Sequence, residues 1–270
     1  MARLSPRHCP GQVCLEHSLE IYPVPTHRET RRDYFGNESV FFSLESPYRQ
    51  LTVTSLTLVE LQQGQEELGW ATAPWEQVRG QLNLVHPHSD EGRALEFTFG
   101  SPLVPLHPAF ADYARPSFEP GRPLLEAACD LMRRIFSDFS FDPSATTIAT
   151  PTLEVLRKKR GVCQDFAQVQ IACLRSLGLA ARYVSGYIET VPPPGKVKLV
   201  GADASHAWVS VYCPGLGWVD MDPTNNTLPR GRHITVAWGR DFSDVSPLRG
   251  VFVGSGAHEL KVAVDVNAVD

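Results

Sequence analysis

A cysteine near the middle of the chain lies where a helix is predicted to begin. Cys163 belongs to the run GVCQDFA at residues 161–167, and apolar residues then recur at helical spacing as far as Leu177. The unpaired N–H groups and the dipole at the start of a helix favour the thiolate, which is the nucleophilic form of cysteine. Cys163 is therefore a candidate nucleophile. The alternative is a small buried hydrophobic residue, which is what a free cysteine usually is.

A histidine and an aspartate occur on two segments that together predict a β-hairpin. His206 lies near the start of the first segment, Asp222 ends the second, and the Cys-Pro-Gly of residues 213–215 supplies turn chemistry between them. If those three residues form the loop, His206 lies directly opposite Asp222, close enough for the carboxylate to hold an imidazole N–H. A diagonal pairing would also bring the two side chains within reach of each other.

Nucleophile, base and orienting carboxylate are the three groups that thiol catalysis requires. The histidine takes the thiol proton and later donates it to a leaving amine, and the carboxylate fixes the imidazole tautomer and supports its positive charge. Asp220 has the same strand parity as Asp222 and is therefore a rival for the carboxylate role. Asp165 follows Cys163 by two positions and is interpreted first as a charge that favours the start of the helix, and only second as part of the site.

Four runs of residues around these positions are GVCQDFA at 161–167, ARYVSGY at 181–187, SHAWV at 205–209 and GWVDMDPT at 217–224. Together they closely resemble the core of the transglutaminase-like superfamily, and within it a bacterial branch of candidate cysteine proteases with a papain-like fold. The resemblance implies that Cys163 is the nucleophile, His206 the general base and Asp222 the orienting carboxylate. It favours Asp222 over Asp220 because the family carries an aspartate directly before Pro-Thr. It implies no metal and no organic cofactor.

The flanking segments resemble the same bacterial proteins. Residues 4–60 are similar to the β-rich N-terminal region that precedes this core, and residues 239–247 resemble the segment that follows it. Related chains usually open with an additional strand before Leu4, so we expect a shortened β-module with one exposed sheet edge.

The resemblance also implies acyl chemistry at the amide bond of a peptide, protein or small amide substrate. Cys163 would attack the carbonyl, an amine or ammonia would leave, and a thioester would be resolved. Water as the second substrate gives a protease or amidase, which the branch resemblance favours, whereas an amine gives a transglutaminase. A non-catalytic peptide-binding scaffold is the alternative of a different class. The backbone N–H of Cys163 is one donor to an oxyanion, and the spacing does not place the second.

Hydrophobic periodicity predicts an α+β protein in two parts. Residues 1–110 indicate a β-rich, sandwich-like N-terminal module, and residues 111–270 a papain-like core with an antiparallel sheet and a C-terminal β extension. Six prolines between Pro102 and Pro123 indicate a linker, with a domain boundary near residue 110. The predicted strands cover 15–22, 40–45, 51–61, 95–99, 180–187, 206–212, 218–222, 234–238 and 260–266, and the predicted helices cover 124–139, 153–159 and 163–177.

Composition bears on several classes of function. A formal net charge of -5 leaves no broad basic surface for nucleic acid. No apolar run reaches the roughly 18 residues that a membrane-spanning helix needs. The first residues lack the apolar stretch of a secretory signal, and six scattered cysteines are too few for a disulfide scaffold. We therefore expect reduced thiols in a cytoplasmic protein; the sequence predicts no oligomeric state.

Two sets of metal-ligand residues are incomplete in the sequence. His86 and His88 with Asp90 lack a further group of ligands and are interpreted as a solvated loop. Cys9 and Cys14 resemble half of a zinc site, but no matching pair follows at a suitable spacing. Neither set is taken as a predicted metal site.

Overall fold

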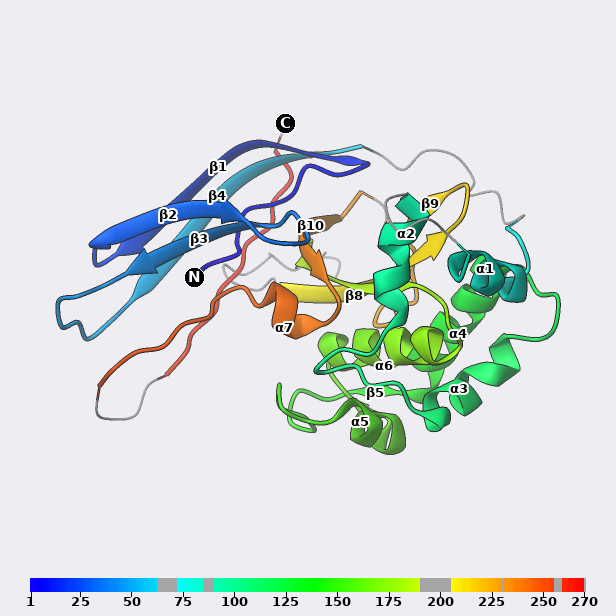
Figure 1. The fold of residues 1–270 in the computed structure, drawn as a ribbon. Helices are drawn as coiled ribbons and strands as arrows, with labels where there is room; N and C mark the ends of the chain where they lie inside the picture. Colours follow the sequence, from blue (N-terminus) through cyan, green and yellow to red (C-terminus); the bar gives the residue numbers. More distant parts are fainter. Residues whose placement is uncertain (63–71, 85–89, 190–204, 230, 255–258, 270) are drawn as a thin grey trace, which may run out of the picture.

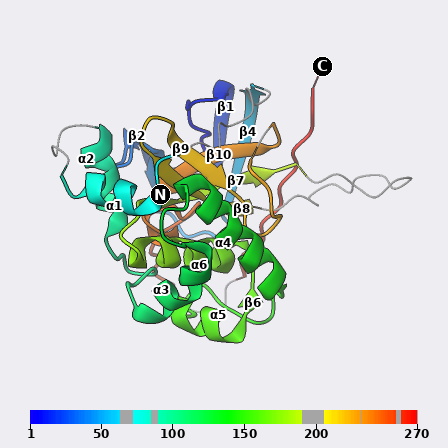
Figure 2. The same ribbon diagram turned by 90° about the vertical axis from the view of Figure 1, so that its right-hand side faces the viewer.

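A four-stranded antiparallel sheet forms the centre of the computed structural model, which describes residues 1–62, 72–84, 90–189, 205–229, 231–254 and 259–269. The strand order is β10-β7-β8-β9, so that β10 and β9 form the two edges. Helices gather on one side of this sheet (Figures 1 and 2), and the mixture of helices with antiparallel strands confirms the predicted α+β class. The strands are β7 (Ala181–Ile188), β8 (Ser205–Cys213), β9 (Gly217–Met221) and β10 (His233–Gly239).

The helices bury their apolar sides in one hydrophobic core with the sheet. Helix α6 is buried along almost its whole length, and α4 is amphipathic, with Leu125, Ala128 and Leu131 completely buried at helical spacing. Gly178 follows α6 with a φ of +79°, the left-handed conformation predicted for a glycine at that position. The helices are α1 (Trp75–Leu82), α2 (Asp90–Leu95), α3 (Pro108–Ala114), α4 (Leu124–Asp138), α5 (Thr152–Lys158), α6 (Cys163–Ser176) and α7 (Phe242–Val245), with the 3-10 helices η1 (Glu96–Thr98) and η2 (Arg115–Ser117) and the short strands β5 (Ser140–Phe141) and β6 (Arg160–Gly161).

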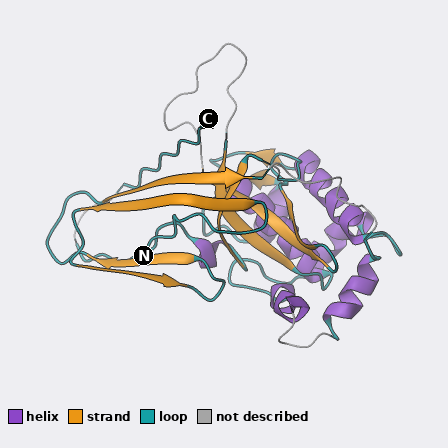
Figure 3. Cartoon of the chain, turned by 90° about the horizontal axis from the view of Figure 1, so that it is seen from above, coloured by secondary structure: helices purple, strands orange, loops and turns teal. Residues whose placement is uncertain are grey.

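The N-terminal module consists of two long antiparallel ribbons, seen at the left of Figure 3. Its apolar interior is small and is formed by Ala2, Leu19, Ile21 and Val40. Burial alternates along residues 16–22 and 52–57, as the predicted period of two requires, because one side of these strands faces this interior. The pairs are β1 (Gln12–Tyr22) with β4 (Thr52–Leu61) and β2 (His27–Arg32) with β3 (Glu38–Ser43).

The strand predicted at residues 95–99 is wrong, because this segment ends α2 and forms η1. Ala94 and Phe97 are both buried at helical spacing, while Phe99 is exposed. Phe97 packs edge-on against Trp218 of β9, with ring centroids 5.2 Å apart. The aromatic enrichment that indicated a strand therefore comes from a short helix that covers the sheet.

The proline-rich segment after residue 102 is not an extended linker. Pro108 is the first residue of α3, where a helix tolerates proline because the missing N–H has no intrahelical partner. His107 caps this helix through its ring nitrogen, and Phe110 and Ala114 are completely buried in the same core as α4 and α6. The domain boundary near residue 110 stays a prediction.

The strand predicted at residues 260–266 is not formed. Leu260 and Val262, which its alternation would place on one face, are exposed. Alternation alone does not give a strand, because a strand needs a paired neighbour to satisfy its backbone groups. In the part of the chain described here, no helix combines the length and the apolar character needed to cross a bilayer.

The N-terminal module is joined to the central sheet through the free edge of β10. The Gln12 side chain accepts a hydrogen bond from the Thr235 N–H at 2.7 Å and donates one to the Thr235 carbonyl at 2.8 Å. Asn37 makes the same pair of bonds with the backbone of Trp238, at 3.0 and 2.9 Å. The Arg7 guanidinium lies 3.5 Å from the centre of the Trp238 ring. Two buried amides thus take the place of a further strand beside β10.

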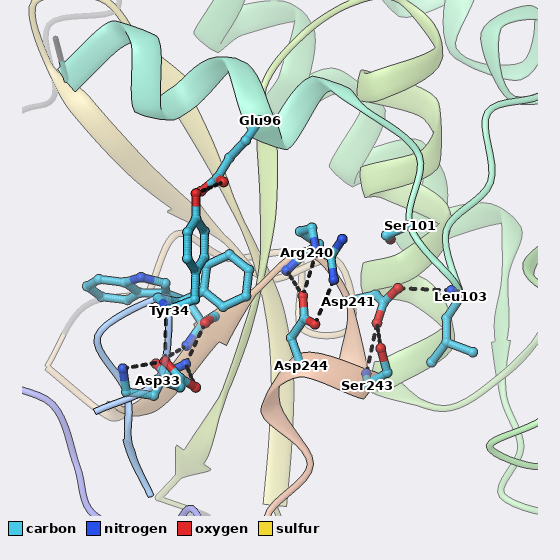
Figure 4. A network of polar contacts seen from close by, with 12 residues as sticks. Asp33, Tyr34, Glu96, Ser101, Leu103, Arg240, Asp241, Ser243 and Asp244 are labelled. Carbon is cyan, nitrogen blue, oxygen red and sulfur yellow. Dashed lines mark hydrogen bonds and ion pairs between the residues drawn. The ribbon is translucent and has the colours of Figure 1, made fainter. Parts of the chain in front are cut away.

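A polar network surrounds the same junction (Figure 4). Asp33 pairs with Arg3, and the Tyr34 hydroxyl donates to Glu96 at 2.9 Å, which connects the β2–β3 turn with η1. Asp244 accepts two hydrogen bonds from the guanidinium of Arg240. These charges are paired with one another within the protein, so we interpret this network as a structural contact.

Replacing Gln12 with leucine is expected to lower the free energy of unfolding by about 1–3 kcal/mol, because the buried Thr235 N–H loses its partner. The Thr235 carbonyl keeps a bond from the backbone N–H of Arg7. Urea unfolding curves measure the change. Gln50→Leu is the matched control, because Gln50 is an exposed glutamine of the same module and its loss should change stability by less than about 0.5 kcal/mol. Equal stability of the two variants would contradict the assigned role of Gln12.

Candidate active site

Cys163 is the first residue of α6, as predicted, and is partly exposed. The helix starts here because the carboxylate of Asp165 accepts a hydrogen bond from the Val162 N–H at 2.8 Å and one from the Thr146 hydroxyl at 2.6 Å. Gly161 lies so close to this carboxylate that a Cβ would collide with it. Asp165 therefore stabilises the start of the helix, which is the first of its two predicted roles.

His206 and Asp222 are brought into direct contact. His206 lies near the start of β8 and is 8% exposed, and Asp222 follows β9 and is completely buried. The distance between His206 Nε2 and Asp222 Oδ2 is 2.7 Å. A buried carboxylate is stable only when its oxygens are hydrogen bonded, and the imidazole supplies one of these bonds.

The predicted register of the hairpin is wrong by two residues, although the predicted contact between His206 and Asp222 is formed. Cys213 pairs with Gly217, so residues 214–216 form the loop, and the register places Asp222 opposite Trp208. Gly215 and Gly217 both have positive φ, which sets the position of this turn. His206 therefore reaches Asp222 along a diagonal of the ladder, the geometry that long side chains can span.

The turn after β9 saturates the Asp222 carboxylate with hydrogen bonds. Asp222 Oδ1 accepts from the backbone N–H groups of Thr224 and Asn225, at 2.9 and 3.2 Å. Oδ2 accepts from the Asn225 side-chain amide at 2.7 Å, in addition to His206. A backbone bridge between Asp222 and Thr227 closes the turn. The Asp-Pro-Thr sequence thus forms a turn that holds the carboxylate in one orientation.

The charges of these groups are mutually dependent. Burial alone would lower the pKa of His206, but its hydrogen bonds with Asp222 and Cys163 and the negative charge of both groups raise this pKa to about 9. Burial alone would raise the pKa of Asp222, but hydrogen bonds from His206 and His233 hold it well below its usual value. His206 is therefore an imidazolium at neutral pH, between a carboxylate and the sulfur of Cys163.

Asp220, the rival carboxylate, has a different partner. Its Oδ2 accepts a hydrogen bond from Trp208 Nε1 at 3.0 Å, and no hydrogen bond joins it to His206 among the described residues. Asp220 also lowers the cost of burying the Arg182 guanidinium, which lies 4.3 Å from the centre of the Trp218 ring. The structure thus brings Cys163 and His206 together with Asp222 and assigns Asp220 to the packing of the sheet.

His233 is a member of this cluster that the sequence did not indicate. Its Nε2 lies 3.0 Å from Asp222 Oδ2, and the ring is almost completely buried. A histidine at the start of a predicted strand gives no signal of such a contact, because residues 222 and 233 are joined by a loop whose course the sequence does not predict. Only the folded chain shows that one carboxylate oxygen accepts from two histidines.

Within the described residues, one cluster has the composition of a metal site. The ligand atoms of His206, Asp222 and His233 lie within 4.8 Å of one another. The same Asp222 oxygen accepts a hydrogen bond from the Asn225 amide, whose N–H groups cannot ligate a cation and would face it. The donor set therefore fits a hydrogen-bonded network better than a metal site. His86 and His88 lie outside the described residues, and Cys9 and Cys14 are free cysteines.

Comparison with known proteins follows the two parts of the chain. Residues 111–223 match the model of the transglutaminase-like superfamily, and residues 1–60 match that of the bacterial transglutaminase-like N-terminal region. An uncharacterised protein of Mycobacterium tuberculosis strain H37Rv is 44% identical over 97% of this chain and 84% of its own length. The chain belongs to the transglutaminase-like superfamily. Its N-terminal part is the bacterial region that accompanies the core in that family.

One further relative by sequence and one solved structure are also similar to this chain. A protein-glutamine gamma-glutamyltransferase of Pseudomonas aeruginosa is 30% identical over 134 residues, which cover 44% of this chain and 20% of that protein. A crystal structure of a candidate cysteine protease from Cytophaga hutchinsonii has a TM-score of 0.71 at 21% identity, covering 91% of this chain and 77% of that one. The second comparison shows that this chain shares its fold with that protein over nearly its whole length.

Proposed function

We propose that this protein is a thiol enzyme that cleaves amide bonds through a thioester on Cys163. At neutral pH His206 already holds the proton of the thiol as an imidazolium, and the Cys163 thiolate attacks the carbonyl carbon of the amide. The tetrahedral intermediate collapses, the C–N bond breaks, and His206 returns the proton to the leaving nitrogen. Asp222 holds the His206 ring and balances its charge throughout. The products of this half-reaction are an amine, or ammonia, and an acyl thioester.

The second half-reaction regenerates the thiol. Water gives up one proton to His206 while its oxygen forms a bond with the thioester carbonyl, and the C–S bond breaks as the sulfur regains a proton. A primary amine in place of water would give a new amide, which is the reaction of a transglutaminase. We favour hydrolysis because the chain resembles the candidate cysteine protease over most of its length. No metal is needed for either step.

One observation carries this proposal: His206 is hydrogen bonded to Asp222 at 2.7 Å and lies near enough to Cys163 for that sulfur to raise the pKa of the imidazole. A peptide-binding scaffold with no activity would have no use for a buried imidazolium beside a partly exposed sulfur. The position of Cys163 at the start of α6 adds a second support, because the backbone N–H groups there favour negative charge on the sulfur and on an oxyanion beside it. We propose the Cys163 N–H as one oxyanion donor.

The test is incubation with a library of glutamine-containing peptides, with and without a primary amine, followed by mass spectrometry. Cleavage, deamidation and amine incorporation change the peptide mass in different ways, so a single spectrum distinguishes them. We expect hydrolytic products from the wild-type protein and none from Cys163→Ala. Cys14→Ala is the matched control, because Cys14 is also partly exposed and lies in the N-terminal module. Equal product formation by Cys163→Ala and wild type would refute the proposal.

A further inference from the structure

His233 reaches the Asp222 carboxylate from the opposite edge of the central sheet. It begins β10, whereas Asp222 follows β9, and β7 and β8 lie between these two edge strands. Gly186 of β7 allows the Trp208 ring and β10 to pack closely here, because a Cβ at this position would lie 2.7 Å from the Trp208 ring and would collide with the Ile234 carbonyl. The Trp208 ring covers this glycine and packs edge-on against His233, with ring centroids 5.2 Å apart.

The hydrogen bonding of His233 determines what it does at the carboxylate. Asp222 carries a negative charge and can only accept, so His233 Nε2 donates to Oδ2 across 3.0 Å. Its other ring nitrogen, Nδ1, is buried and has no hydrogen-bond partner among the described residues. A neutral ring with the proton on Nε2 leaves only a lone pair without a partner there, whereas a proton on Nδ1 would leave a buried N–H unpaired. The geometry therefore favours a neutral ring that donates from Nε2.

Separate contacts hold the strand of His233 and its ring. On the outer edge of β10, the amide of Gln12 is bonded to the backbone of Thr235, two residues along from His233. On the face of the sheet, the Trp208 ring contacts the imidazole. The N-terminal module holds β10, and His233 connects this strand to the Asp222 carboxylate that contacts His206. Its position depends on packing that lies outside the turn of Asp222.

We infer that His233 is a positioning residue for the proposed reaction, which holds Asp222 Oδ2 where it receives the Nε2–H of His206. Asp222 Oδ1 is fixed by the N–H groups of Thr224 and Asn225, so the orientation of the carboxylate depends on what holds its other oxygen. Three side-chain groups do this, those of His206, His233 and Asn225. Only His233 reaches it from the far edge of the sheet. This inference rests on the proposed function, because it concerns the orientation of the base.

The test compares His233→Gln with His233→Leu. Glutamine can place an amide N–H near the position of Nε2, whereas leucine removes the donor. The rate of alkylation of Cys163 by iodoacetamide at neutral pH reports how well His206 is placed beside the sulfur. We expect the leucine variant to react about tenfold more slowly, as for loss of one hydrogen bond to a charged group, and the glutamine variant to stay within about twofold of wild type.

Spectra of protein labelled with 15N-histidine add a second readout, because they show which ring nitrogen carries each proton. We expect the wild-type protein to show the Nε2–H form of His233, and the Nε2–H signal of His206 to move in the leucine variant only. Cys173, which is completely buried, reports folding, because it becomes reactive only if the variant unfolds. Should His233→Leu unfold, His233→Asn takes its place, since its amide is too short to reach Nε2, and the same slowing is expected.

Each outcome decides the inference. Slow alkylation of Cys163 in His233→Leu, together with a normal rate in His233→Gln, supports the inference. Equal alkylation rates in all folded variants overturn the inference, and so does equal slowing in His233→Leu and His233→Gln. Either result leaves the proposed function unaffected, provided that wild-type Cys163 reacts rapidly and that this reactivity depends on His206. If wild-type Cys163 shows no such dependence on His206, the proposed function fails and the inference fails with it.

Discussion

Asp222→Asn is expected to reduce turnover by about 10⁴-fold, the effect seen when the carboxylate that orients a catalytic histidine becomes an amide. The NH₂ group of the new asparagine has no acceptable position in this structure. In one orientation it faces the donors that meet at Oδ2, those of His206, His233 and Asn225. In the other it faces the backbone N–H groups of Thr224 and Asn225. Either way donors oppose donors, and His206 loses its orientation.

The matched control for this variant is Asp220→Asn, two residues earlier in the chain. Asp220 accepts a hydrogen bond from one side chain, Trp208, and an asparagine can continue to accept it through its carbonyl oxygen. We expect this variant to keep turnover within about tenfold of wild type. Both are measured on the peptide that the library screen selects. A larger loss in Asp220→Asn than in Asp222→Asn would show that the two carboxylates are assigned in the wrong order.

Turnover is expected to fall about tenfold for each pH unit above about 9, because the His206 imidazolium that donates a proton to the leaving nitrogen is lost there. The raised pKa has its cause in Asp222 and Cys163, which outweigh the effect of burial. The dependence of kcat/KM on pH measures it. A decline that starts near the usual histidine value of 6.5 would show that His206 does not have the charged partners assigned to it.

The same pKa has a consequence for stability. The folded protein keeps a proton on His206 between pH 6.5 and about 9, whereas the unfolded chain releases it. This group therefore contributes stability that is fully present below pH 6.5 and is lost as the pH rises through 9. Unfolding free energies measured across that range should fall with pH in wild type and fall less in His206→Gln.

The three residues of the candidate site were accessible to sequence reasoning because each lies at a position with a strong local signal. Cys163 starts a helix whose apolar residues have a clear period, and His206 and Asp222 flank a turn rich in proline and glycine. The register of that turn was not accessible, because two glycines with positive φ, Gly215 and Gly217, compete to set the loop. The contact tolerates the error because a shift of two residues keeps both side chains on the same face.

What the sequence could not predict depends on contacts between distant segments. His233 contacts Asp222 where Gly186 lets the Trp208 ring and β10 pack closely and where Gln12 holds β10 from outside. The aromatic enrichment of residues 95–99 predicts a strand, whereas the segment is helical because Phe97 packs on Trp218. The alternation at residues 260–266 likewise needs a neighbouring strand, which no local pattern supplies.

Competitive alkylation of the six cysteines by a limiting amount of iodoacetamide at neutral pH tests most directly whether Cys163 and His206 act as one unit. Cys9 and Cys14 are also partly exposed, and burial raises the pKa of both thiols, so exposure alone does not favour Cys163. We predict that Cys163 is modified first in wild type and that His206→Ala removes this preference. Modification of Cys163 at the rate of Cys14, with no change in His206→Ala, would contradict the account.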